Sequence, residues 1–173
     1  MKLRFLVLPF LALAGFAFAG EPAPAPRERL QQFLKDLPLI EVLVQEGISL
    51  AGEEDPLKRA QTCNVLAKTL VTEIQQAAGH KDEGRAASLG NYLQAVLVRG
   101  VAGNLDLART TAPQGASRAP EMKLISDQVL EVTQPVADSS PESKIMQPAA
   151  QAVNTGRVAV EKALHGKGRD KKN

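Results

Sequence analysis

The regular spacing of small and apolar residues between positions 55 and 79 constrains the fold of this chain more than any other feature. Asp55-Pro56 favours a helix start, because aspartate accepts hydrogen bonds from free backbone amides and proline tolerates the first helical position. Gly79 favours a helix end. Between them, small and apolar residues recur at alternating intervals of three and four, at Ala60, Cys63, Ala67, Leu70, Ile74 and Ala77. Such residues form one line along a helix, so a helix that buries this line is predicted.

The same spacing returns after a short polar turn at 80–84, which predicts an antiparallel helical hairpin over about 55–104. The residues of the second line are Ala86, Leu89, Leu93, Val96 and Gly100. Glycine inside a helix costs about 1 kcal/mol relative to alanine. Gly90 and Gly100 therefore indicate that two helices approach each other closely.

A second hairpin is predicted over about 120–164. Gly103-Asn104 is expected to cap the preceding helix, and the aperiodic residues 105–119 are expected to form a linker. The first line of the second hairpin comprises Met122, Ile125, Val129, Val132 and Val136. Its second line comprises Ile145, Ala149, Ala152, Gly156, Ala159 and Ala163.

Two local sequence features bear on the second hairpin: a capping pattern in its turn and a proline in each of its helical segments. Ser139 and Glu142 have the spacing of a capping box, which predicts that the last helix starts there. Pro135 and Pro148 each remove a backbone hydrogen bond. Two interpretations stay open: the prolines kink the two helices as a pair, or each one starts or ends a shorter helix.

The segment before the first hairpin is predicted to be helical but interrupted. Residues 20–26 (GEPAPAP) form a Pro/Ala linker, and 27–36 show a short helical pattern. Pro38 is expected to break that pattern. Residues 39–50 (LIEVLVQEGISL) suit a buried helix or a short strand. We favour the helix, because no second strand-like segment is available to pair with a strand.

These elements predict an all-α fold. Two antiparallel helical hairpins would form a small four-helix-type bundle with an extra N-terminal helical segment. The helical domain is expected to span 27–164. Residues 165–173 (HGKGRDKKN) are expected to form a disordered basic tail.

Residues 1–19 have the pattern of a secretory signal peptide. Lys2 and Arg4 precede an uncharged apolar stretch, and Ala17-Phe18-Ala19 suits cleavage before Gly20. The apolar stretch is shorter than the roughly 20 residues of a membrane span. Lys2 and Arg4 account for the whole formal net charge of +2, so the processed chain would be neutral. Neutrality removes the case for nucleic acid as a partner.

Chemically active residues are sparse. Cys63 is the single cysteine, and its place in the first buried line predicts an inert packing residue rather than a thiol that forms disulfides. His80 and His165 each lie near a predicted helix end, where a cation complements the helix dipole. Neither has a cysteine or another histidine at ligand spacing. No catalytic motif is present, so neither an enzyme nor a bound cofactor or metal is expected.

Surfaces for a partner remain the main functional clue. Lines rich in alanine and glycine bury little area per residue, which favours association through an exposed apolar face. Val98, Val101 and 39–44 are the candidates for such a face. The alternative is that the N-terminal segment packs across the hairpin and completes the core.

The segment 55–105 (DPLKRAQTCNVLAKTLVTEIQQAAGHKDEGRAASLGNYLQAVLVRGVAGNL) resembles the hairpin of uncharacterised exported bacterial helical proteins. The resemblance implies a helical hairpin and no particular activity. We expect a non-enzymatic interaction module of the bacterial envelope, periplasmic or extracellular, that binds another envelope protein or itself. The alternative function is a periplasmic stress- or metal-responsive accessory protein, with ligands from Cys63, His80 or acidic side chains.

Overall fold

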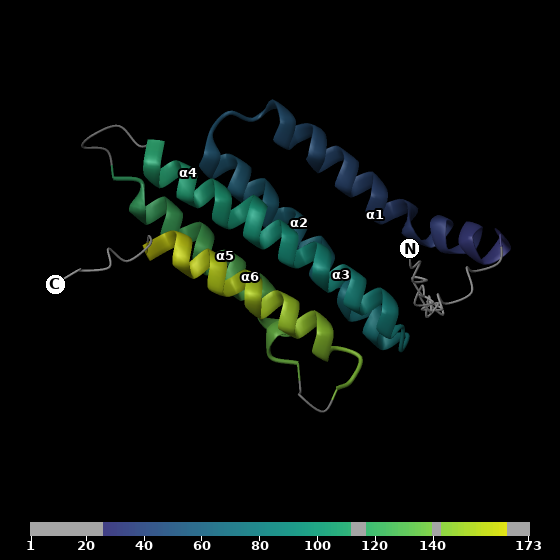
Figure 1. Ribbon diagram of the computed structural model, residues 1–173. Helices are drawn as coiled ribbons and strands as arrows, with labels where there is room; N and C mark the ends of the chain where they lie inside the picture. Colours follow the sequence, from purple (N-terminus) through teal and green to yellow (C-terminus); the bar gives the residue numbers. More distant parts are fainter. Residues whose placement is uncertain (1–25, 112–116, 140–142, 166–173) are drawn as a thin grey trace, which may run out of the picture. The chain divides into compact units, whose positions relative to one another are not determined.

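The computed structural model describes residues 26–111, 117–139 and 143–165, and its regular elements there are all helices (Figure 1). They are α1 (Pro26–Gly52), α2 (Pro56–Gly79), α3 (Glu83–Ala95), the π-helix η1 (Val96–Ala102), α4 (Gly103–Thr111), α5 (Ala119–Ala137) and α6 (Gln147–His165). The prediction of an all-α chain is therefore confirmed for this part of the chain. The predicted signal peptide (1–19), nearly all of the 20–26 linker and of the 165–173 tail lie outside the described residues.

The chain divides into two compact units, Met1–Asp36 and Leu37–Asn173. The described part of the first unit is the beginning of α1. The second unit contains the rest of α1 and a helical bundle in which α2 packs against α3, η1 and α5, while α6 packs against α3, η1 and α5 (Figure 1). None of the described helices is both long and apolar enough to cross a membrane.

Helix α2 follows the predicted boundaries because its start is determined locally. The Leu57 amide donates to Asp55 Oδ1 at 2.8 Å, and Pro56 occupies the first helical position. All six residues of the predicted line are buried. The C-terminal end of α2 differs from the prediction in one detail: the residue with left-handed backbone angles is Lys81 (φ 60°), not Gly79. The amides of Lys81 and Asp82 donate to the carbonyls of α2's last turn, which completes a Schellman motif around Lys81.

Close helix contact explains the glycines of the core. A Cβ placed on Gly90 would lie 2.6 Å from the Ala149 Cα on α6, and one on Gly156 would lie 2.6 Å from Leu97 Cδ1. No real Cβ tolerates these distances without movement of its neighbours. The close approach predicted at Gly90 is therefore confirmed, as is that at Gly100, where a Cβ would lie 2.6 Å from the Cys63 Sγ, and Gly156 provides a third instance.

The π-helix η1 shifts the buried line that the sequence predicted. Val96 and Gly100 are only partly buried, and the fully buried side chains are those of Leu93, Leu97, Val101 and Leu105. Residues spaced four apart drift around an α-helix, which has 3.6 residues per turn. The wider turns of the π-helix keep these residues on one side of the helix. The sequence gives no local signal for this insertion.

The helix after η1 also runs further than predicted. Gly103-Asn104 does not cap it, since α4 continues to Thr111, and the first part of the predicted 105–119 linker is helical. The buried Asn104 side chain instead donates to the Gly100 carbonyl at 2.6 Å, inside the helix. Residues 112–116 of that linker lie outside the described residues.

In the second pair of helices, the predicted helix start at Ser139 is wrong. The Ser139 hydroxyl donates back to the Pro135 carbonyl at 3.2 Å, so it serves the end of α5 instead of capping α6. Helix α6 begins at Gln147, which places Pro148 in its first turn, while Pro135 lies inside α5 near its end. Glu142 falls outside the described residues.

Helix α1 confirms the helical interpretation of 39–50 but neither the expected burial, since most of the segment is exposed, nor the expected interruption at Pro38. The helix continues through Pro38, whose side chain is exposed. An exposed position tolerates proline because water can satisfy the carbonyl that loses its amide partner.

Candidate interaction surface

Within the second unit, α1 exposes an apolar face. Its side chains are partly or largely open to solvent: Leu37, Ile40, Leu43, Val44 and Ile48. We call these five residues the docking face. Val44 is 56% exposed and Ile48 is 64% exposed. At the edge of this face, the same helix contributes Leu39 to the core, with Leu50 partly buried against it. At about 100° per residue, Leu39 and Leu50 adjoin Leu43 around the helix, so this part of α1 has one wide apolar face and buries only its Leu39–Leu50 edge.

The described part of the first unit also exposes apolar side chains. Leu30, Phe33 and Leu34 are each more than half exposed. The predicted helical stripe of 27–36 is therefore present on α1 and faces solvent in that unit.

The charged residues of the stretch 37–57 are all acidic. Residues 37–57 contain no lysine or arginine, and Glu41 and Glu46 are the charged residues of α1 in this stretch. Within the described part of the chain, neither glutamate has an ion-pair partner. The docking face is therefore aliphatic, and Glu41, which adjoins Ile48 around the helix, makes no ion pair among the described residues.

Asp55, at the end of the same acidic stretch, is in contrast fully engaged. Arg118 Nη2 lies 2.6 Å from its Oδ2, and the Leu57 amide donates to Oδ1. The hydrogen bond from Arg118, followed by that from Leu57, lowers the pKa of the Asp55 carboxyl below its usual value. This group joins the starts of α2 and α5 and is structural.

Cys63 is buried, as the sequence predicted. A Cβ on Gly100 would lie 2.6 Å from its Sγ, so the sulfur packs directly against the backbone of η1. Burial raises the pKa of the thiol, and Arg59 acts in the opposite direction. A buried thiol with a raised pKa is a poor nucleophile and a poor metal ligand.

The structure does not bring the two histidines to Cys63. His80 follows the last residue of α2, about 25 Å along the helix axis from Cys63. His165 is the last residue of α6, and both imidazoles are exposed. In the described ranges, no group of three or more His, Cys, Asp or Glu residues is placed to hold a metal ion.

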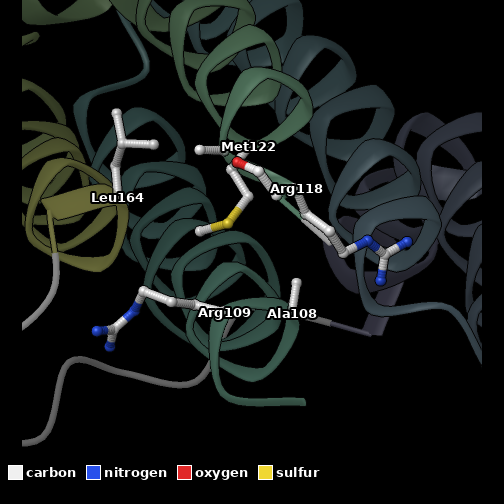
Figure 2. Close-up of a pocket in the computed structure, with 7 residues that line it drawn as sticks. Ala108, Arg109, Arg118, Met122 and Leu164 are labelled. Atoms are coloured by element: carbon white, nitrogen blue, oxygen red, sulfur yellow. The ribbon is translucent and has the colours of Figure 1, made fainter. Parts of the chain in front are cut away.

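A small pocket of about 230 Å³ lies between the end of α4, the start of α5 and the end of α6 (Figure 2). Ala108, Met122 and Leu164 supply its apolar wall. The guanidinium groups of Arg109 and Arg118 point away from Met122 (Figure 2) and pair with Asp106 and Asp55. The pocket therefore offers no convergent polar groups for catalysis or for binding an anion.

Sequence reasoning located part of the docking face. Ile40, Leu43 and Val44 lie within the predicted segment 39–44 and are exposed, whereas Leu39 is buried. Of the other candidates, Val98 is partly exposed and Val101 is completely buried. Leu37 and Ile48 were missed, although Leu37, Ile40, Val44 and Ile48 follow one another at helical spacings of three and four.

Comparisons of this chain with protein-family models, with curated proteins and with solved structures find no match. Its function is therefore inferred from the described surface.

Proposed function

We propose that this chain is an exported, non-enzymatic helical protein that acts as an interaction module in the bacterial envelope and engages a protein partner through the docking face. In this proposal, one hairpin of α2 with α3, η1 and α4 and another of α5 with α6 form a four-helix-type scaffold. The scaffold holds α1 so that the Leu39–Leu50 edge packs and the docking face remains available. Export is inferred from the signal-peptide pattern of residues 1–19.

The observation that carries the proposal is the clustering of exposed aliphatic side chains on one helix. Single exposed apolar residues are ordinary on protein surfaces, and Val65, Tyr92, Leu124 and Val158 are of that kind, each on a different helix. The docking face instead places five aliphatic side chains within three turns of α1. Contiguous apolar patches of this kind mark binding surfaces, and a helix face of this kind suits helix-in-groove or helix-pair recognition.

Photo-cross-linking in expressing cells tests the proposal. A photoreactive amino acid is placed at position 44 or, as the matched control, at position 158. We expect a discrete cross-linked adduct from position 44 and none from position 158, because Val158 is exposed to a similar degree but is the one exposed large hydrophobic residue among the described residues of α6. Absence of an adduct at position 44, or the same diffuse products from both positions, would contradict the proposed function.

A further inference from the structure

We draw no further inference here: the strongest candidate, the exposed aliphatic docking face of α1, belongs to the surface already described, and nothing in the described part of the chain shows what covers it.

Discussion

Helices α1 and α2 carry similar apolar spacing but use it differently. Every residue of the predicted line on α2 is buried, and that line is packed by helices on more than one side. Residues 37–52 of α1 are more apolar in sequence, yet most of their aliphatic side chains face solvent. The α2 line includes Ala60, Cys63, Ala67 and Ala77, which let neighbouring helices come close. Between these two helices, the one whose line contains small residues is therefore the one that is buried.

The glycines show the same contrast. Gly90 has the backbone of α6 against it, and Gly47 on α1 has open space. One glycine is required by a neighbouring helix, and the other has no neighbour within 4 Å. The following predictions test this contrast, beginning with the largest expected effect.

Truncation of single side chains should show the difference in packing between α2 and α1 most clearly. Leu70 on α2 is 1% exposed, so Leu70→Ala should lower the free energy of unfolding by about 3 kcal/mol through lost burial and a cavity. Ile48→Ala on α1 should change it by less than about 0.5 kcal/mol. Urea unfolding followed by circular dichroism measures both. Similar losses for the two variants would mean that the docking face is packed in solution.

Alanine substitution of the two glycines should have opposite signs. Gly90→Ala should destabilise the protein by about 2 kcal/mol, because its Cβ would lie 2.6 Å from the Ala149 backbone. Gly47→Ala should stabilise it by about 0.5–1 kcal/mol, because helix propensity improves and no clash arises. Thermal unfolding of the pair gives the sign of each change. A stabilising Gly90→Ala would refute the close contact between α3 and α6.

Asp55 tests the start of α2. Asp55→Ala removes the helix cap and the partner of Arg118, and should cost about 1–2 kcal/mol. The pKa of Asp55 is lowered from 3.8 in the folded protein. Its contribution is therefore complete above pH 3.8 and is lost as pH falls through the lower folded pKa. Unfolding measured between pH 7 and pH 2 should show the variant and the parent converging in acid; a constant difference would contradict this.

The smallest expected effect concerns Cys63. Because its thiol is buried against Gly100, the molar mass measured by light scattering should be the same with and without reductant. Alkylation of the native protein should be slow and should accelerate on addition of urea. A species of twice the mass that disappears on reduction would place the thiol at the surface.

Local sequence features predicted much of the fold. The start of α2 follows from Asp55 and Pro56, and its buried line was predicted in full, because capping and helical spacing act within a few residues. The predictions fail where a distant or competing group determines the local structure. Ser139 bonds to the end of α5 instead of starting α6, and the capping signal alone does not distinguish these outcomes.

The sequence by itself determined that this chain is helical and which side of α2 is buried, because backbone hydrogen bonds and side-chain periodicity are local properties. The tertiary structure decided the rest. The π-helix at Val96–Ala102 brings Leu97 and Val101 into the core and sets Gly100 against Cys63, a fit that involves two helices at once. It also decided how much of the apolar face of α1 is covered, since only its Leu39–Leu50 edge meets the core.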